Sequence, residues 1–209
     1  MYTLYYLPGA CSLAIHALIN ELGQEVKLEN VSVPQGEPRS PEFLKVNPRG
    51  QVPVLVDGDL VLREGGAIIN YLLDKHNSNM LPKSQPERAQ SLEWLMFANA
   101  TLHPAYARMF FINRIIKDEN AKEEAINAGI EQINKLWAEV DQQLAKTKYT
   151  CGDQITGADI LLTVIANWIG YLPKPVQLGD NTKRMLKEII NRPAFKKALS
   201  EEKIEYKAV

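Results

Sequence analysis

Cys11 is the side chain at the start of the chain with the clearest capacity for chemistry. It follows the Pro8-Gly9 turn and precedes residues 12–22, SLAIHALINEL, whose apolar positions have helical spacing. Unpaired N–H groups and the positive end of the dipole gather where a helix begins, so this position is predicted to favour thiolate over thiol. A buried, unreactive cysteine is the alternative. Cys11-Ser12-Leu13-Ala14 is not a Cys-x-x-Cys motif, so a dithiol cycle is excluded and a single-thiol role stays open.

Two other stretches have residue types suited to holding a peptide-like ligand. A cis bond at Val52-Pro53 would leave the Val52 N–H and C=O free to pair with an extended peptide, whereas an ordinary edge proline would not. Glu64-Gly65-Gly66 opens a helical stretch. There a ligand carboxylate could lie on bare backbone N–H groups while Glu64 meets a ligand ammonium. A simple helix start with a favourable carboxylate is the alternative.

The remaining polar candidates are weaker. His103 lies inside a long helical stretch and is followed by Pro104, which is expected to kink the helix. His16 is expected to be structural, and Cys151 to be a structural or exposed turn residue. The chain has only three histidines, all scattered, so no metal site is indicated.

Composition indicates an ordinary globular protein. The 209 residues are 45% hydrophobic and 23% charged, with a formal net charge of -1. The balanced charge argues against a nucleic-acid or anionic-membrane surface, so a small molecule or another subunit is the expected partner. No apolar run could span a bilayer and the N-terminus does not resemble a signal peptide, so we expect a cytoplasmic protein.

The first part of the chain alternates strand and helix signals. Residues 3–7 predict a strand, and residues 13–22 a helix capped by Ser12 and ended by Gly23. Residues 25–33 predict a second strand, 40–46 a short helix, 53–62 two strands joined at Asp57-Gly58, and 64–76 a helix. This order indicates a small α/β domain over residues 1–77.

Residues 78–88 are predicted to be a linker, and residues 89–209 an all-helical domain. Helical spacing covers residues 88–116, 121–146 and 156–172, followed by shorter pieces. Thr156 and Asp159 have the pattern of a capping box that opens an almost wholly apolar helix, which should be the buried centre of the second domain. The charged residues 201–209 are expected to be a solvated end.

Four motifs in this order, YYLPGACS, NPRGQVPVL, REGGAIINYL and TGADI, resemble the cytosolic glutathione transferases. The cysteine in PGACS makes the bacterial beta class the closest match. The resemblance implies a thioredoxin-like N-terminal domain and an all-α C-terminal bundle that forms the second-substrate pocket. It also implies a homodimer and glutathione as cosubstrate, with no metal.

The resemblance also implies residue roles. Cys11 matches the active-site cysteine, Val52-Pro53 the cis-proline step that holds the cysteinyl part of glutathione, and Glu64-Gly65 the turn that holds its γ-glutamyl end. His103 matches a histidine that faces the second-substrate pocket, and nearby contacts are expected from Ala10, Ser12 and Gln51. Two departures are evident. Pro104 stands where the beta class commonly has lysine, and no basic residue for the glycyl carboxylate is obvious, although Arg39 is a candidate.

The expected activity is conjugation of the glutathione thiol to hydrophobic electrophiles, in detoxification. Donors around residues 10–12 would stabilise the glutathione thiolate. Alternatively, Cys11 forms a mixed disulfide with glutathione and supports thiol-disulfide exchange. Two non-enzymatic alternatives remain open, namely a binding or regulatory stress protein and a carrier of hydrophobic ligands; turnover of a bound ligand separates both from a transferase.

Overall fold

The computed structural model describes residues 1–34 and 36–209, and these form two compact units. The first, here called the sheet unit, comprises Met1–Leu81 and Asn191–Glu205, and the second, the helical unit, comprises Pro82–Ile190 and Tyr206–Val209. The sequence predicted a boundary at residues 78–88 and assigned everything after it to one helical domain. The structure differs, because residues 191–205 return to the sheet unit.

Four strands form one mixed sheet in the order β2-β1-β3-β4. They are β1 (Tyr2–Tyr6), β2 (Val26–Asn30), β3 (Val54–Asp57) and β4 (Leu60–Arg63). β1 pairs in parallel with β2 and antiparallel with β3, and β3 pairs antiparallel with β4 across the predicted Asp57-Gly58 turn, where Gly58 has a φ of 60°. Side chains of β1 alternate between buried and half-buried, as expected for a strand with one face on a core.

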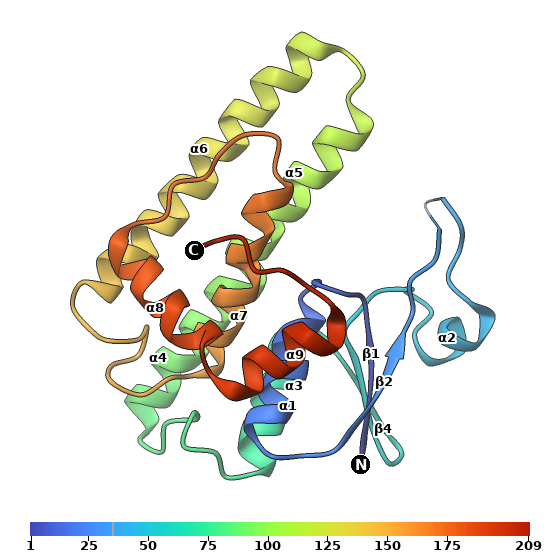
Figure 1. Cartoon of the computed structure of the whole chain (residues 1–209), viewed down its shortest axis with the longest axis vertical. Coiled ribbons are helices and arrows are strands. Elements are labelled where there is room, and N and C mark those ends of the chain that lie inside the picture. The colour runs from blue at the N-terminus through green and yellow to red at the C-terminus, as the bar shows by residue number, and fades with distance from the viewer. Residues whose placement is uncertain (35) are drawn as a thin grey trace. The chain divides into compact units, whose positions relative to one another are not determined.

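The helices of the sheet unit are α1 (Ser12–Glu21), α2 (Pro41–Val46), α3 (Gly65–Lys75) and α9 (Pro193–Glu202). α1 contacts β1, α3 and α9, and α9 lies beside α1 although the two are at opposite ends of the chain (Figure 1). Every residue from Ser12 to Ile19 is buried, which follows because α1 is covered by the sheet and by two helices. The thioredoxin-like domain expected from the resemblance is confirmed.

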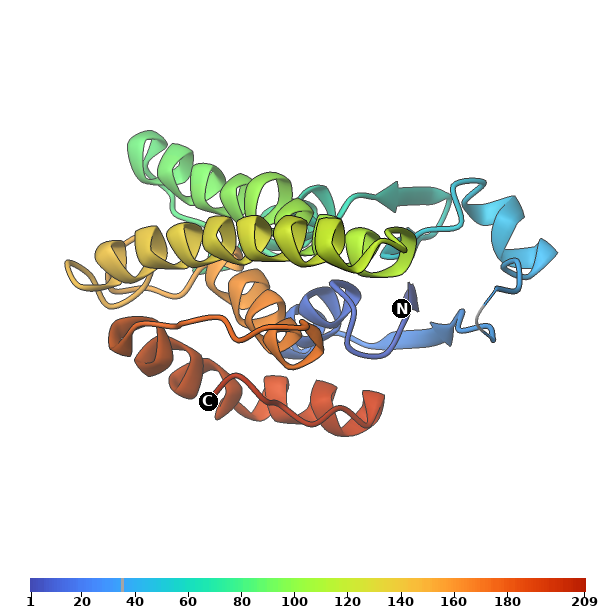
Figure 2. The same ribbon diagram turned by 90° about the horizontal axis from the view of Figure 1, so that it is seen from above.

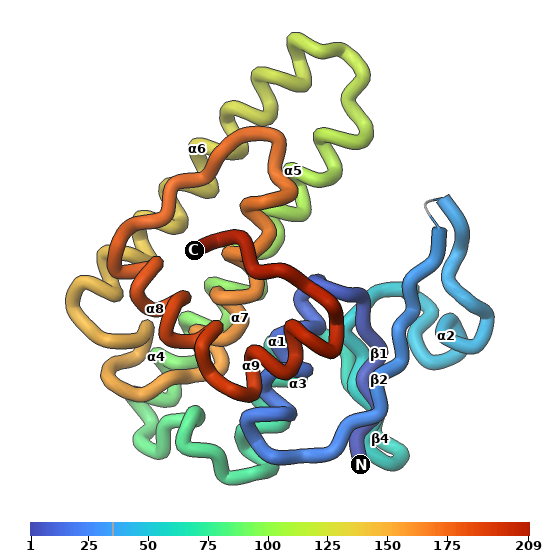
Figure 3. Tube along the Cα trace, in the orientation of Figure 1, coloured from blue at the N-terminus to red at the C-terminus, as the bar shows by residue number. Residues whose placement is uncertain are grey.

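The helical unit contains α4 (Gln85–Met96), η1 (Phe97–Leu102), α5 (His103–Ile115), α6 (Glu119–Leu144), α7 (Gly157–Ala166), η2 (Asn167–Tyr171) and α8 (Asp180–Ile190). α5 and α6 pack side by side, and a short connection reverses the chain between them (Figures 2 and 3). All of α7 is buried, so the prediction that it forms the centre of this unit is confirmed. No helix among the described residues is long and apolar enough to cross a membrane.

The predicted capping box at the start of α7 is present. The Asp159 carboxylate is fully buried and accepts hydrogen bonds from the N–H and hydroxyl of Thr156, both at 2.8 Å. It also accepts hydrogen bonds from the N–H and hydroxyl of Thr150, at 2.9 and 2.8 Å. Burial raises the pKa of Asp159, while these four donors act in the opposite direction. One side chain therefore satisfies both the helix start and the preceding turn.

Pro104, which was predicted to kink a long helix, lies where a π-helical turn is followed by an α-helix. Residues Phe97–Leu102, directly before it, form a π-helical turn, and α5 begins at His103 with proline in its first turn. Proline has no N–H and its ring clashes with the carbonyl four residues earlier in a regular α-helix. A wider turn relieves that clash, and such insertions are common at functional sites.

Candidate active site

Cys11 lies at the corner between β1 and α1. The turn is closed by a hydrogen bond from the Ala10 N–H to the Leu7 carbonyl, at 3.1 Å, and Gly9 has a φ of 71° that favours glycine. Cys11 is the residue directly before α1 and is 9% exposed. Since the Ala10 N–H is already paired with Leu7, the donors that remain at this corner are the N–H groups of Cys11 and Ser12.

The Cys11 thiol donates a hydrogen bond to the Val52 carbonyl, with an Sγ to O distance of 3.7 Å. Burial raises the pKa of Cys11 to about 11, although the N–H groups of Cys11 and Ser12 act to lower it. The Glu64 carboxylate adds a smaller contribution that also raises the pKa. The prediction that this position favours thiolate is therefore wrong, because desolvation outweighs the helix N-terminus.

Ser12 closes the turn instead of capping α1. Its hydroxyl accepts a hydrogen bond from the Leu7 N–H at 3.3 Å and donates one to the Leu7 carbonyl at 3.2 Å. The side chain makes no capping hydrogen bond and the residue is fully buried. The capping prediction is wrong because Ser12 lies one position too late, Cys11 being the N-cap. Its hydroxyl proton is already used by Leu7, so Ser12 supports the corner that holds Cys11.

The Val52-Pro53 bond is cis, which is the condition that the peptide-binding hypothesis required. Val52 presents its carbonyl to Cys11, and its N–H has no hydrogen-bond partner among the described residues. The preceding residue is held by the buried Asn47, whose side-chain amide donates to the Gln51 carbonyl at 2.8 Å, while the Gln51 side chain is exposed. The backbone of Val52 is thus available to a ligand in an extended conformation.

Glu64 directly precedes α3, of which Gly65 is the first residue. Its φ of 72° is unusual for a residue with a side chain and costs of order 1–3 kcal/mol, a cost that tends to occur at functional sites. The carboxylate is 64% exposed and accepts a hydrogen bond from Nη1 of Arg49 at 2.9 Å. Because Glu64 also influences Cys11, the structure brings the predicted Cys11, Val52 and Glu64 to one corner of the sheet unit.

Arg39 uses part of its guanidinium to bind two loops of the sheet unit. Its Nη1 donates to the Val31 carbonyl at 2.6 Å and its Nε to the Gly50 carbonyl at 3.2 Å. Arg39 therefore connects the loop after β2 to the loop before β3 through hydrogen bonds. The sequence could not show this, because both partners are backbone carbonyls without a residue signature.

His103 belongs to the helical unit, at the first residue of α5. Its ring packs against Trp168, with ring centroids 4.8 Å apart and planes at 62°. Tyr106 and Phe110 also pack against Trp168, at 5.9 and 6.4 Å, so His103 is part of an aromatic cluster. Its predicted role toward a second substrate stays a prediction.

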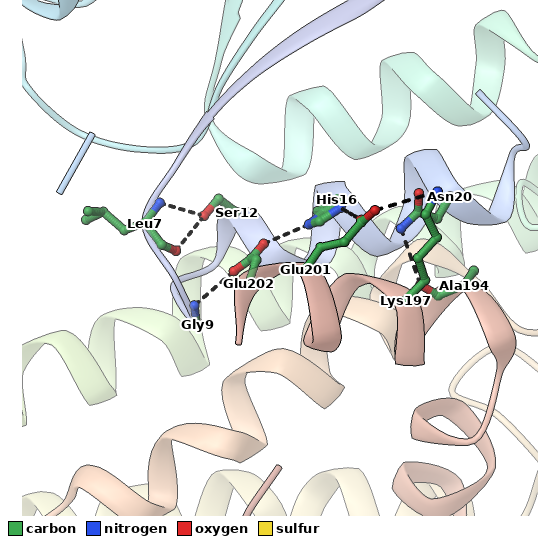
Figure 4. Close-up of polar contacts among 9 residues, drawn as sticks. All are labelled: Leu7, Gly9, Ser12, His16, Asn20, Ala194, Lys197, Glu201 and Glu202. Atoms are coloured by element: carbon green, nitrogen blue, oxygen red, sulfur yellow. Dashed lines mark hydrogen bonds and ion pairs between the residues drawn. The ribbon is translucent and has the colours of Figure 1, made fainter. Parts of the chain in front are cut away.

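Sequence reasoning missed a buried polar cluster behind the corner (Figure 4). His16 is fully buried, with Nδ1 3.0 Å from Glu202 and Nε2 2.8 Å from Glu201. Glu202 also accepts the Gly9 N–H at 3.0 Å, so α9 supports the turn that precedes Cys11. The expectation that residues 201–209 are a solvated end is wrong at Glu202, which is buried. No local pattern could have linked residues so distant in sequence.

No group of three or more histidine, cysteine, aspartate or glutamate side chains that could hold a metal ion occurs among the described residues. The residues at the corner, with a thiol, an exposed peptide backbone and an exposed acid, are instead suited to a small thiol peptide with an ammonium group. Cys151 lies in the helical unit, half-buried, and its thiol is within 3.8 Å of the Thr150 hydroxyl.

Comparison with known proteins agrees with this arrangement. The family model for the N-terminal domain of glutathione S-transferase matches residues 1–74, and the model for the C-terminal domain matches residues 102–193. A glutathione S-transferase of Xanthomonas campestris is 31% identical, over 79% of this chain and 81% of that protein.

Solved structures show the same likeness over nearly the whole chain. A glutathione S-transferase from Xylella fastidiosa has a TM-score of 0.88 at 28% identity, covering 98% of this chain and 100% of that one. A sphingomonad glutathione S-transferase complexed with glutathione has a TM-score of 0.81 at 29% identity. The match covers 97% of this chain and 100% of that one. The solved structures with similar TM-scores include a bacterial beta-class glutathione S-transferase from Sphingomonas chungbukensis.

Proposed function

Because the chain belongs to the glutathione S-transferase family, a family of transferases, we propose that it conjugates the thiol of reduced glutathione to hydrophobic electrophiles. The observation that carries the proposal is the backbone of Val52. Its carbonyl lies beside the Cys11 thiol and its N–H has no partner among the described residues, so the cysteinyl part of a peptide could pair with this backbone. Glu64 and the start of α3 at Gly65 would then meet the γ-glutamyl end.

The state of Cys11 favours conjugation over a covalent role. With a pKa of about 11, Cys11 is a protonated thiol at neutral pH and a poor nucleophile. A protonated thiol can donate a hydrogen bond to a neighbouring sulfur, and the N–H groups of Cys11 and Ser12 can do the same. Lowering the pKa of the glutathione thiol from about 8.5 toward neutral requires only roughly 2 kcal/mol of differential stabilisation. Thiol-disulfide exchange through Cys11 would require the less favoured thiolate.

The finer parts of the proposal follow from the family resemblance. The sheet unit would bind glutathione, and the helical unit would supply the pocket for the electrophile, with His103 among its residues. We also propose that the protein is a homodimer, that it is located in the cytoplasm and that it acts in detoxification. The identity of the electrophile is a matter for substrate screening, because such pockets are built from scattered side chains.

Calorimetric titration with reduced glutathione, paired with a spectroscopic assay on an activated aryl halide, tests the proposal. We expect wild-type protein to bind glutathione and form the thioether, and Cys11→Ala to retain both within a few-fold, since Cys11 assists without bonding covalently. Intact-mass measurement after treatment with oxidised glutathione should show no adduct on Cys11. Binding without turnover of any electrophile would instead support the non-catalytic alternative, and absence of binding would contradict the proposal.

A further inference from the structure

A buried histidine links two neighbouring carboxylates of α9 within the sheet unit (Figure 4). The side chains of His16 and Glu202 are fully buried, whereas that of Glu201 is 41% exposed. Nδ1 of His16 lies 3.0 Å from Oε1 of Glu202, and Nε2 lies 2.8 Å from Oε2 of Glu201. A carboxylate can only accept, so His16 bonds to Glu202 through a proton on Nδ1. A buried carboxylate needs such a donor, and His16 therefore holds Glu202 in one orientation.

Glu202 uses its second oxygen to hold the turn that precedes Cys11. Oε2 accepts the Gly9 N–H at 3.0 Å, where the φ of Gly9 is 71°. The turn also packs on the residue two positions after Glu202, because a Cβ on Gly9 would lie 3.2 Å from Cδ1 of Ile204. Lys203 ends α9 with a left-handed φ of 57°, a common helix ending that reverses the chain. Two contacts from the end of α9 thus fix the Gly9 turn.

The same turn determines the direction of the N–H groups of Cys11 and Ser12. Its internal hydrogen bonds involve Leu7, which accepts the Ala10 N–H and exchanges two hydrogen bonds with the Ser12 side chain. These bonds keep the shape of the turn, whereas Glu202 fixes where the turn lies on the end of α9. A hydrogen bond weakens steeply when its donor points away from the acceptor. A small rotation of the turn would therefore weaken the contact of both N–H groups with a ligand sulfur.

We propose that His16 and Glu202 are positioning residues of the reaction, an inference that rests on the proposed function. Glu202 holds the turn so that the two N–H groups after it meet the glutathione sulfur, and His16 holds Glu202 through Nδ1. The exposed Glu201 on Nε2 is not required for this role. Both positioning residues are buried and act through the turn, whereas the Val52 backbone and Glu64 hold the rest of the ligand. They should therefore change the ionisation of the bound thiol more than the affinity for the protonated peptide.

Two replacements of His16 separate the roles of its ring nitrogens. An asparagine amide can donate from about the position of Nδ1, and a glutamine amide from about the position of Nε2. The thiolate absorbance of bound glutathione, followed from about pH 5 to 9, reports the ionisation of the ligand, because burial raises the pKa of Cys11 and of Cys151 to about 11. His16→Gln should lower the thiolate fraction at pH 7 about fivefold, and His16→Asn should keep it within about twofold of wild type. At about pH 5.5, where the thiol is protonated, calorimetry should give both variants the wild-type affinity within about threefold.

The two acids of α9 provide a second test with a matched control. Glu202→Ala removes the acceptor of the Gly9 N–H and should lower the thiolate fraction at least as much as His16→Gln does. Glu202→Gln keeps an oxygen for that N–H and should restore most of the fraction. Glu201→Ala is the control from the neighbouring position and should change nothing. Circular dichroism shows which variants are folded, and the two Glu202 variants decide the question if a His16 variant is not.

A thiolate fraction that falls equally in His16→Gln and His16→Asn, or in neither, would show the inference to be wrong, while glutathione binding would leave the proposed function intact. Affinity at about pH 5.5 that falls in step with the thiolate fraction would mean that the cluster supports the whole site and not the direction of the N–H groups, which also overturns the inference. If wild-type protein binds no glutathione, the proposed function itself is wrong, and the inference with it.

Discussion

At the level of single residues, Cys11 shows how two rules of physical chemistry compete. The start of α1 favours a thiolate, yet Cys11 is 9% exposed and its pKa is raised to about 11. Position along the chain gives the first effect, whereas burial depends on distant parts of the chain, such as the loop that contains Val52. Sequence reasoning could therefore choose the right residue and still predict the wrong protonation state.

The raised pKa predicts the pH profile of Cys11 alkylation. In a Cys151→Ser variant, where Cys11 is the remaining thiol, the iodoacetamide rate should rise about tenfold per pH unit from pH 7 to 10, because only the thiolate reacts. An ordinary cysteine levels off above about pH 8.5. Mass spectrometry of time courses provides the rates, with a short cysteine peptide as reference. A plateau near neutral pH would show that the N–H donors prevail over burial.

The residue types of the site were predictable, but their partners were not. Cys11, Val52-Pro53 and Glu64 stand out because they lie in the motifs PGACS, GQVPVL and EGGAI, whose order resembles that of the glutathione transferases. The contacts of Ser12 and Arg39 are with backbone groups of Leu7, Val31 and Gly50, which leave no mark on the sequence. Roles that depend on side-chain type could thus be predicted from the sequence, whereas roles that depend on loop conformation could not.

At the level of elements, the helical periodicity and the Asp-Gly turn predicted most of the helices and the β3–β4 hairpin. What they could not predict was the π-helical turn over Phe97–Leu102 or the return of α9 to the sheet unit. The first is a local response to Pro104, and the second is decided by long-range packing of α9 against α1. Periodicity shows that a helix has a buried face without showing what covers it.

The start of α8 depends on a carboxylate from another helix, which leads to a pH-dependent prediction. Asp141 on α6 accepts the Thr182 N–H at 2.8 Å and the Asn181 side-chain amide at 3.1 Å. Burial acts to raise the pKa of Asp141, but these hydrogen bonds prevail and lower it. A lowered pKa in the folded state means that the stabilisation is present at neutral pH and is lost as the pH falls through that pKa.

Asp141→Asn should therefore destabilise the protein by about 1–3 kcal/mol at pH 7 and by clearly less at pH 3. Urea unfolding followed by circular dichroism at both pH values measures the two differences. Glu139→Gln is the control, because it removes the same charge from an exposed position of α6. An equal loss at both pH values would mean that the contribution of Asp141 does not depend on its charge.

At the level of the whole molecule, the sheet unit is built from two segments that are far apart along the chain. The helical unit is inserted between α3 and α9 of the sheet unit, so the sheet unit is complete only when the end of the chain has returned. α1 and α9 run antiparallel: Arg192 pairs with Glu21 at one end, at 2.6 and 2.7 Å, and His16 meets Glu201 and Glu202 at the other. The sheet unit is therefore expected to depend on the last helix.

Two truncated chains test that dependence. A chain that ends at Ile190 lacks α9 and should lose at least tenfold in amide-exchange protection across α1, because one covering helix and the Glu202 partner of Gly9 are gone. A chain that ends at Glu205 keeps α9 and lacks only residues 206–209, which belong to the helical unit, so α1 should keep its protection. Exchange followed by mass spectrometry measures both.

Peptides from α6 show in the same experiment whether the helical unit stays folded. Tyr206 donates to the Thr163 carbonyl at 2.8 Å and the Lys207 N–H donates to Asn167 at 2.6 Å, so both truncations remove the same two contacts from that unit. Any extra effect of ending at Ile190 therefore reports on residues 191–205. Unchanged protection of α1 in the shorter chain would mean that the sheet and α3 alone hold the helix that begins beside Cys11, and that α9 contributes nothing measurable to the corner.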